Sequence, residues 1–289
     1  RNSITAPIFQ RLKDNIMNID RYSRQIMLRD FGMAAQEKLA NSSVLVVGAG
    51  GLGCPVLQVL VSSGVGVIGI ADSDKVDFHN LHRQFLYDEQ DVGTPKAVAA
   101  LARLNRMNSD TEIVAFQEMV TTQNVFSIIH NFDVIVDCTD NFTARYLLND
   151  ACFLLKKPLV YGSIFRHEGQ VAVFNVEKEN KITNYRDLFP GPPSPNEVPN
   201  CNKAGVLPSH SSVIGTFQAN EVIKLLTGSD EILVHQLPIF NTKNYQSMKI
   251  NFNKNKEMPE PQTIEELKIF NYEAFCNIRK RMISVQIQN

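Results

Sequence analysis

The stretch that decides the fold runs from Val44 to Asp72 and reads VLVVGAGGLGCPVLQVLVSSGVGVIGIAD. Four apolar residues lead into the segment GAGGLG at positions 48–53, and a second apolar run ends on Asp72. This order predicts a strand, a tight turn, a helix and a second strand that ends on an acidic residue. Glycines let the main chain approach a phosphate, and the N-terminus of the next helix offers unpaired N–H groups. The pattern therefore predicts a nucleotide site.

Two other interpretations of this stretch carry less weight. A lone G-x-G-x-x-G is weakly specific and also fits an ordinary turn between a strand and a helix. The two flanking strands and the acid at the expected distance favour the nucleotide site. A membrane span is excluded because glycines, serines and Gln58 divide the uncharged stretch into short elements.

Composition limits the classes of partner and the compartment. The net charge is -1 over 289 residues, so no basic field invites nucleic acid or anionic lipid, and we expect neither as a partner. The first twenty residues contain no apolar core of signal-peptide length. The cysteines are odd in number, widely spaced and without a C-x-x-C pair, which predicts a cytoplasmic protein rather than a disulfide framework. They are Cys54, Cys138, Cys152, Cys201 and Cys276.

Strand and helix patterns alternate through the first half of the chain. Helices are expected near Pro7–Met17 and Ala34–Leu39, before the alternation begins. The strand candidates are Val44–Val47, Val67–Ala71, Glu112–Phe116, Val134–Asp137 and Leu159–Tyr161. The helices between them are Leu52–Ser63, Pro95–Asn105, Gln123–Ile129 and Ala144–Leu155. This alternation predicts an α/β fold, a Rossmann-like, doubly wound and mostly parallel sheet with ligands at the carboxyl ends of its strands.

The second half has a different pattern. Gln170–Val176 and Lys249–Phe252 fit strands of an antiparallel C-terminal extension, and Ser212–Leu226 fits an amphipathic helix that ends before Gly228. The segment Arg186–Pro208 holds six prolines, which we expect to exclude regular structure. A long loop inside a compact domain is usually functional.

Charged and polar residues follow the predicted strands. Two cations and an additional carboxylate, Arg83, Lys96 and Asp140, are expected to converge on one edge of the sheet, which suits a triphosphate with magnesium better than a dinucleotide. Taken singly, Arg83 and Lys96 fit solvated surface charges, and Asp140 fits the cap of the next helix. The polar residues at or after the strand ends are Asp72, Asp74, Asn80, Arg83, Gln84, Lys96 and Asp140.

Seven short blocks occur in order along the chain. They are Arg21-Tyr22-Ser23-Arg24-Gln25-Ile26, Val47-Gly48-Ala49-Gly50-Gly51-Leu52-Gly53-Cys54, Asp72-Ser73-Asp74, Asn80-Leu81-His82-Arg83-Gln84, Gly93-Thr94-Pro95-Lys96, Asp137-Cys138-Thr139-Asp140-Asn141 and Cys201-Asn202-Lys203-Ala204-Gly205-Val206. With these blocks the chain resembles the MoeB/ThiF family (also HesA/MoeB/ThiF), bacterial relatives of ubiquitin-activating enzymes. The resemblance covers about Arg21 to Phe252.

The resemblance implies a reaction and a partner. It implies ATP-dependent adenylation, with Mg²⁺, of the C-terminal Gly-Gly carboxylate of a small ubiquitin-like sulfur carrier in molybdopterin or thiamin biosynthesis. Arg24 resembles the arginine that such enzymes donate to a neighbouring subunit, so a homodimer is expected. The remaining implied roles are phosphate binding by Gly48, Gly50, Gly51 and Gly53, ribose binding by Asp72, nucleotide contacts by Asp74, Asn80 and Gln84, charge neutralisation by Arg83 and Lys96, and magnesium binding by Asp140.

The resemblance also implies a division of the chain. Residues 1–42 would form N-terminal helices and a dimer arm. Residues 43–252 would form the adenylating Rossmann-like domain with a proline-rich crossover loop at 186–208. Residues 253–289 would form a linker or tail, and Met282–Gln286 is similar to the entry into the rhodanese-like domain of some relatives.

Two features depart from or divide the family. Many members bind structural zinc through two C-x-x-C pairs, but here Asn184 and Asp187 stand at the first pair and no cysteine lies between Cys201 and Cys276, so no zinc is predicted. Cys201 fits either a covalent catalyst, as in thiamin-pathway relatives, or an inert loop cysteine. His210 could lower the pKa of Cys201 or merely begin a helix.

Other functions remain possible at this point. Another adenylating enzyme could act on a peptide or a modified tRNA base. A NAD-binding oxidoreductase would need only the glycine segment and an acid on the ribose, so Arg83, Lys96 and Asp140 argue against it. A silent binding scaffold is disfavoured because the charged set is intact. Cys54 and Cys138 are expected to be packing residues.

Overall fold

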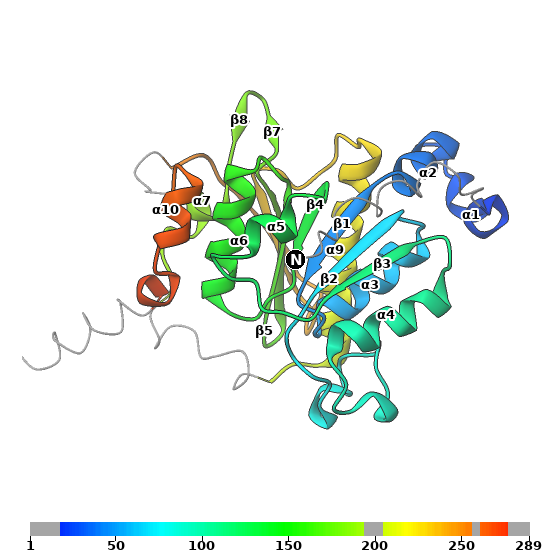
Figure 1. Cartoon of the computed structure of the whole chain (residues 1–289). Coiled ribbons are helices and arrows are strands. Elements are labelled where there is room, and N and C mark those ends of the chain that lie inside the picture. Colours follow the sequence, from blue (N-terminus) through cyan, green and yellow to red (C-terminus); the bar gives the residue numbers. More distant parts are fainter. Residues whose placement is uncertain (1–17, 194–204, 256–260, 277–289) are drawn as a thin grey trace, which may run out of the picture.

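An eight-stranded sheet lies at the centre of the computed structural model, which describes residues 18–193, 205–255 and 261–276 (Figure 1). The strand order is β10-β9-β6-β5-β4-β1-β2-β3. The strands are β1 (Ser43–Val47), β2 (Val67–Ala71), β3 (Glu112–Phe116), β4 (Val134–Asp137), β5 (Leu159–Phe165), β6 (Glu168–Phe174), β9 (Gln236–Asn241) and β10 (Ser247–Asn251). A separate hairpin pairs β7 (Glu177–Lys178) with β8 (Lys181–Ile182).

Strand direction divides the sheet into two halves. The five strands β1 to β5 pair in parallel, whereas β6, β9 and β10 pair antiparallel to their neighbours. Val47 of the central strand is in register with Ala71 on one side and Asp137 on the other. The carboxyl ends of β1, β2 and β4 therefore meet at one edge, which confirms the predicted Rossmann-like sheet with its antiparallel extension.

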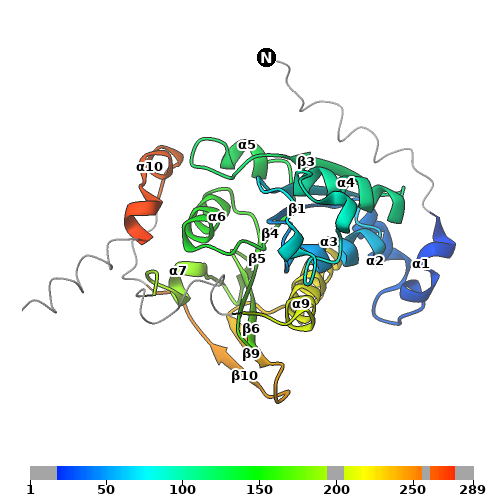
Figure 2. The ribbon, with the colours of Figure 1, turned by 90° about the horizontal axis from the view of Figure 1, so that it is seen from below.

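Helices cover both faces of the sheet (Figure 2). Val44 and Val46 of β1 pack with residues of α3, α4 and α9, and the intervening Leu45 and Val47 pack with residues of α5 and α6 on the other face. This alternation is the period of two expected of a strand buried on both sides. The helices are α1 (Ile19–Ile26), α2 (Gly32–Ala40), α3 (Gly53–Ser62), α4 (Lys96–Met107), α5 (Val125–Ile129), α6 (Phe142–Leu154), α7 (Tyr185–Leu188), α9 (Pro208–Thr227) and α10 (Ile264–Ile269).

The proline-rich segment differs from its prediction at both ends. Arg186 belongs to α7, because Asn184 caps that short helix by accepting a hydrogen bond from Arg186 N at 2.8 Å. Pro208 is the first residue of α9, where its missing N–H costs nothing. The expectation that Arg186–Pro208 excludes regular structure is therefore wrong at its two ends.

Some elements were not expected from sequence, and two predictions cannot be compared. Helix α1, helix α7, the short hairpin β7–β8 and strand β9 were missed. The predicted helix Pro7–Met17 lies outside the described residues, as does Met282–Gln286. Within the part of the chain that the structure describes, no helix combines the length and the apolar character needed to cross a bilayer.

Candidate active site

The glycine segment forms a tight connection between β1 and α3. Gly48 adopts φ +94°, and its N–H donates to Ala71 O at 2.9 Å. A methyl group placed on Gly48 would lie 2.7 Å from Cys138 O, so a glycine is required for the segment to pass the end of β4. The N-terminus of α3 has no side-chain cap, although Cys54 N already donates to Gly50 O at 2.9 Å and Pro55 carries no N–H.

Asp72 holds this glycine segment in place. Its Oδ2 accepts a hydrogen bond from Ala49 N at 2.7 Å, and its Oδ1 accepts one from Asp74 N at 2.8 Å. Burial raises the pKa of the Asp72 carboxyl, while the Ala49 N–H and the nearby Lys96 charge oppose that rise. The carboxylate thus bridges the ends of β1 and β2 at the predicted nucleotide edge.

Lys96 is directed toward the same edge. It is the first residue of α4, its side chain is only 7% exposed, and its Nζ lies 3.0 Å from Asp74 Oδ2. The Asp74 side chain is 70% exposed, so the pair is open to solvent on one side only. The interpretation of Lys96 as a solvated surface charge is therefore wrong.

The segment after β2 wraps around the glycine turn. A methyl group placed on Gly51 would lie 3.7 Å from Cδ of Arg83, and one placed on Gly50 would lie 3.6 Å from Nε2 of Gln84. Asn80 is buried and accepts a hydrogen bond from Asp77 N at 3.3 Å, which closes the short helix of residues 78–80. Arg83 and Gln84 therefore flank the glycines, and Asn80 shapes the turn that presents them.

Asp140 lies at the neighbouring strand end. It follows β4 by three residues and is exposed. The cap of α6 is Asn141, whose Oδ1 accepts a hydrogen bond from Ala144 N at 2.8 Å. The interpretation of Asp140 as the cap of this helix is therefore wrong, and its carboxylate is available at the edge where Asp72 and Lys96 lie.

The donor set fits magnesium carried by a phosphate ligand. Magnesium is usually bound by one or two carboxylates together with substrate phosphates, and an exposed Asp140 next to the glycine turn would supply such a carboxylate. Among residues 18–193, 205–255 and 261–276, no group of three or more His, Cys, Asp or Glu side chains could hold a metal by itself.

Asn184 and Asp187, at the positions of the family's first zinc-binding pair, form hydrogen bonds within the protein instead. The Asp187 Oδ2 accepts a hydrogen bond from Asn184 N at 2.7 Å, and Asn184 accepts one from Arg186 N in return. The second Asp187 oxygen accepts a hydrogen bond from Asn255 N at 2.8 Å and lies 3.6 Å from Lys254 Nζ. These oxygens are committed to the cap of α7 and to the segment after β10.

Arg24 lies at the other end of its own chain's fold. It is exposed on α1, and its neighbour Gln25 donates a hydrogen bond to Ser63 O at 2.9 Å, at the C-terminal end of α3. The glycine segment precedes the N-terminal end of the same helix, which spans about 15 Å. Figure 1 shows α1 at the upper right, far from the segment after β2 at the bottom.

The described cysteines are free and mostly buried. Cys54, Cys138 and Cys152 are fully or nearly fully buried, and burial raises the pKa of the Cys54 thiol to about 12. This confirms Cys54 and Cys138 as packing residues. Cys201 lies outside the described residues. His210 is buried in the first turn of α9, which agrees with the expectation that it begins a helix.

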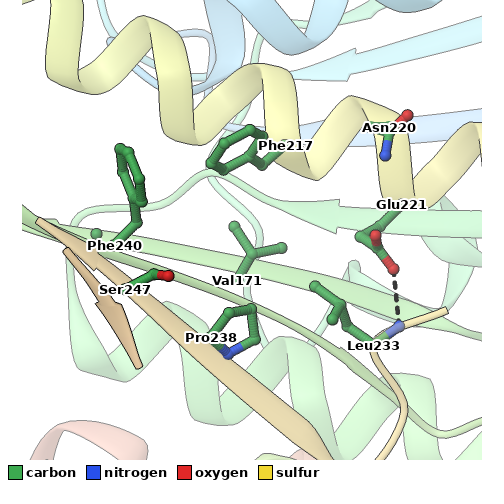
Figure 3. Close-up of a pocket in the computed structure, with 9 residues that line it drawn as sticks. Val171, Phe217, Asn220, Glu221, Leu233, Pro238, Phe240 and Ser247 are labelled. Atoms are coloured by element: carbon green, nitrogen blue, oxygen red, sulfur yellow. Dashed lines mark hydrogen bonds between the residues drawn. The ribbon is translucent and has the colours of Figure 1, made fainter. Parts of the chain in front are cut away.

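A separate cavity of about 240 Å³ lies between α9 and strands β6, β9 and β10 (Figure 3). Glu221 contributes a carboxylate that accepts a hydrogen bond from Leu233 N at 2.8 Å. None of the predicted site residues that the structure describes lines this cavity. Its apolar lining includes Val171, Phe217, Leu233, Pro238 and Phe240.

A buried polar cluster behind Asp140 was not found from sequence. Arg145 of α6 and Gln218 of α9 both bond to the end of β4, with Arg145 Nη2 donating to Thr139 O at 3.0 Å and Gln218 Nε2 donating to Asp137 O at 2.8 Å. The residues come from separate elements, so no local pattern joins them. The position of Arg145 one helical turn after Asp140 was the only signal.

Comparisons with known proteins agree with these observations. The ThiF family profile matches residues 22–262. The sulfur carrier protein adenylyltransferase of Thermus thermophilus is 43% identical over 267 residues, covering 90% of this chain and 97% of the relative. Adenylyltransferase and sulfurtransferase MOCS3 of Culex quinquefasciatus is 44% identical over 269 residues, covering 92% of this chain and 61% of the relative. This chain therefore spans only about three fifths of that relative.

Solved structures share the fold at lower identity. PaaA matches with a TM-score of 0.71 and 22% identity, covering 88% of this chain and 78% of that chain. MccB of E. coli with ATP matches with a TM-score of 0.71 and 20% identity, covering 83% of this chain and 74% of that chain. Together with the family match over most of the sequence, the predicted resemblance is confirmed: the chain belongs to the ThiF family.

Proposed function

We propose that this protein adenylates the C-terminal Gly-Gly carboxylate of a small ubiquitin-like sulfur carrier protein with ATP. The observation that supports the proposal most is Arg83 next to Gly51 of the glycine turn, together with the buried Lys96 that pairs with Asp74 after β2 and the exposed Asp140 after β4. The names of the Thermus and Culex relatives, a sulfur carrier protein adenylyltransferase and an adenylyltransferase and sulfurtransferase, support a carrier as the substrate.

The reaction forms one bond and breaks another. A carboxylate oxygen of the carrier attacks the α-phosphorus of ATP, the bond to the β-phosphate oxygen breaks, and the products are an acyl-adenylate and pyrophosphate. The attacking carboxylate is already ionised near pH 7, so no general base is required. The protein contributes position and charge stabilisation.

Each residue at the carboxyl edge of the parallel strands would have its own role in the reaction. Gly48, Gly50, Gly51 and Gly53 would let the main chain approach the phosphates. Asp72, with Asp74, Asn80 and Gln84, would hold the ribose side and the turn. Arg83 and Lys96 would neutralise the triphosphate, and Asp140 would hold Mg²⁺, which when bound screens phosphate charge.

Arg24 is proposed to act in a neighbouring copy of the chain. Because α3 separates it from the glycine turn of its own chain, it cannot complete that site without a large rearrangement. A symmetric homodimer would let each α1 present Arg24 to the partner's site. The proposal further includes a cytoplasmic location. It also includes the absence of structural zinc, since the Asp187 oxygens already accept main-chain N–H groups.

A thermal unfolding experiment tests the nucleotide class. ATP with magnesium, at a concentration about 100 times its Kd, would stabilise the fold by about 2.7 kcal/mol, and NADH at the same concentration would leave the melting temperature unchanged. Stabilisation by NADH and none by ATP with magnesium would overturn the proposal in favour of an oxidoreductase. ATP with EDTA is the control that isolates the contribution of magnesium.

A further inference from the structure

Arg145 occupies the interior directly behind the Asp140 carboxylate. Its side chain is 7% exposed, and its Nε lies 3.8 Å from Asp137 Oδ2. Its Nη2 donates to Thr139 O at 3.0 Å, and its Nη1 donates to Ser163 Oγ at 3.1 Å. The guanidinium therefore joins the residues that immediately precede Asp140 to the neighbouring strand β5.

The guanidinium is also fixed by aromatic rings and by strand β5. It lies 5.1 Å from the centre of the Tyr161 ring and 5.9 Å from that of Phe142. Nη1 further donates to the Tyr161 hydroxyl at 3.3 Å. A planar guanidinium with this many partners has a single orientation, which a lysine ammonium would not reproduce.

Several further hydrogen bonds hold the segment of residues 137–139, to which Arg145 is bonded. Asp137 Oδ1 accepts hydrogen bonds from Thr139 N at 2.9 Å and Thr139 Oγ1 at 2.6 Å. Gln218 of α9 donates to Asp137 O at 2.8 Å, and the close approach of Gly48 to Cys138 O places the glycine turn against the same segment. The end of β4 is thus hydrogen-bonded to α6 and α9 and lies directly against the glycine turn.

This arrangement is costly if stability is its only purpose. Burial raises the pKa of the Asp137 carboxyl, opposed by the Arg145 charge and by the Thr139 hydrogen bonds. Apolar residues of similar volume often replace a buried ion pair without loss of stability. Carboxylates that hold metals, in contrast, are commonly oriented by a second layer of hydrogen-bonded residues, and Arg145 has the place of such a residue.

We propose that Arg145 is a positioning residue for adenylation: through Asp137 and Thr139 it fixes the main chain that presents Asp140 to the magnesium-bound triphosphate. The inference rests on the proposed function, because it takes Asp140 as the magnesium ligand. Arg145 acts on the reacting atoms only through that carboxylate.

The test combines kinetics with a binding measurement that needs no carrier. Arg145→Gln should lower kcat for carrier-dependent exchange of pyrophosphate into ATP about 10- to 100-fold and leave the KM for the carrier unchanged. The magnesium concentration that half-saturates the thermal stabilisation by ATP should rise by a similar factor. Arg145→Lys should recover little of the lost kcat or of the magnesium affinity, because a lysine restores the positive charge but not the planar set of guanidinium donors.

A double-mutant cycle with Asp140→Asn separates positioning from a general effect. If Arg145 acts through Asp140, adding Arg145→Gln to Asp140→Asn should cost less than about 2-fold in kcat, since coupled residues are not additive. Full additivity would overturn the inference.

Arg186 provides the matched control. It pairs with Asp150 further along α6, its Nη2 lying 2.7 Å from Asp150 Oδ2, and this pair is at least as buried as the Arg145 pair. Arg186→Gln should lower the melting temperature and leave kcat and the magnesium dependence unchanged. The inference is wrong if Arg145→Gln shows this same pattern of lost stability with unchanged kcat and magnesium dependence.

Two further arms keep the test decisive. Should Arg145→Gln fail to fold, Asp137→Asn removes the same ion pair with an isosteric side chain and should show the same loss of kcat and shift in magnesium dependence; unchanged values would overturn the inference. If wild type is stabilised by ATP with magnesium but shows no carrier-dependent exchange, the carrier proposal fails, and the magnesium dependence of Arg145→Gln still supports or overturns the inference.

Discussion

The two halves of the sheet differ in where they place polar side chains. In the parallel half, strands β1, β2 and β4 are buried along their whole length, and acids stand at or just after the carboxyl ends of β2 and β4. In the antiparallel half, all five residues of β10 are exposed, and the adjoining cavity is mostly apolar. Parallel strands all end at one edge, so the residues that follow them converge, while antiparallel strands distribute theirs over both edges. The candidate site residues therefore gather at the edge where the parallel strands end.

The largest effect is expected from Asp140 at the parallel edge. Asp140→Ala should lower carrier-dependent exchange of pyrophosphate into ATP by about 10²-fold or more, as removal of other charge-stabilising groups does. Cys201→Ala should leave exchange nearly intact and affect only a later covalent or sulfur-transfer step, because a thiol would attack only after the acyl-adenylate has formed. If Cys201→Ala stops exchange in a folded protein and Asp140→Ala does not, the assigned roles are wrong.

The next largest effect concerns the glycine turn. Gly48→Ala places a methyl group 2.7 Å from Cys138 O at φ +94°, so we expect unfolding free energy to fall by more than the roughly 1–3 kcal/mol of backbone strain alone. Gly93→Ala is the matched control, since Gly93 has φ +87° with no atom within 4 Å. Urea unfolding of both variants isolates the steric part. Equal losses would show that β4 can move away from the turn.

Mixed dimers test whether the parallel edge is completed by a second copy. Arg24→Ala and Asp140→Ala chains, each inactive alone, should recover about a quarter of wild-type exchange after random mixing, because half the dimers are mixed and one of their two sites has both residues. Exchange is measured before and after mixing unfolded and refolded chains. A monomer by light scattering, or no recovery from verified mixed dimers, would show that Arg24 does not act in the partner.

A pH effect is expected from His210 of α9, a helix that contacts β4 and β5 of the parallel half and β6 of the antiparallel half. Burial lowers the pKa of His210, so the folded chain binds the proton less readily than the unfolded chain. His210 therefore supports stability above the usual His pKa of about 6.5, and this contribution is lost as pH falls below it. His210→Gln should flatten the decline of unfolding free energy between about pH 7 and pH 5. An unchanged slope in urea titrations would assign the decline to other groups.

The smallest effect is expected in the antiparallel half. Ile250→Thr on the exposed edge strand β10 should change unfolding free energy by no more than about 0.5 kcal/mol and leave pyrophosphate exchange unchanged. The measurement sharpens the comparison between the halves. A large rise in the KM for the carrier would show that β10 contributes to carrier binding, and the division of roles between the halves would have to be redrawn.

The parallel strands could be predicted from sequence because each is a short apolar run between turn residues. Three of them, Val67–Ala71, Glu112–Phe116 and Val134–Asp137, have the predicted bounds. Strand β9 was missed because Pro238 lies within it, and a proline in a strand normally indicates an edge. Tyr185–Leu188 was missed because neighbouring prolines hide a capping box that is formed by Asn184 and Asp187.

The candidate site was predictable where its residues follow strand ends directly. Asp72 and Asp140 were predicted for that reason, and Lys96 was predicted because it opens the helix after Gly93-Thr94-Pro95. The structure buries the Lys96 side chain and exposes Asp140, which sequence patterns did not distinguish. The support formed by Arg145 and Gln218 could not be found, because its partners lie about 80 positions apart or come from separate elements. Such tertiary hydrogen bonds leave no local period.

Pyrophosphate exchange with a defined carrier tests the central claim most directly. Labelled pyrophosphate is supplied with ATP, magnesium and a sulfur carrier protein that ends in Gly-Gly, and its incorporation into ATP is measured. The account predicts incorporation that requires both this protein and the carrier, and that disappears when the two C-terminal glycines are removed. Incorporation that is unaffected by removing the glycines, or none with intact carriers while ATP is bound, would contradict adenylation of a Gly-Gly terminus.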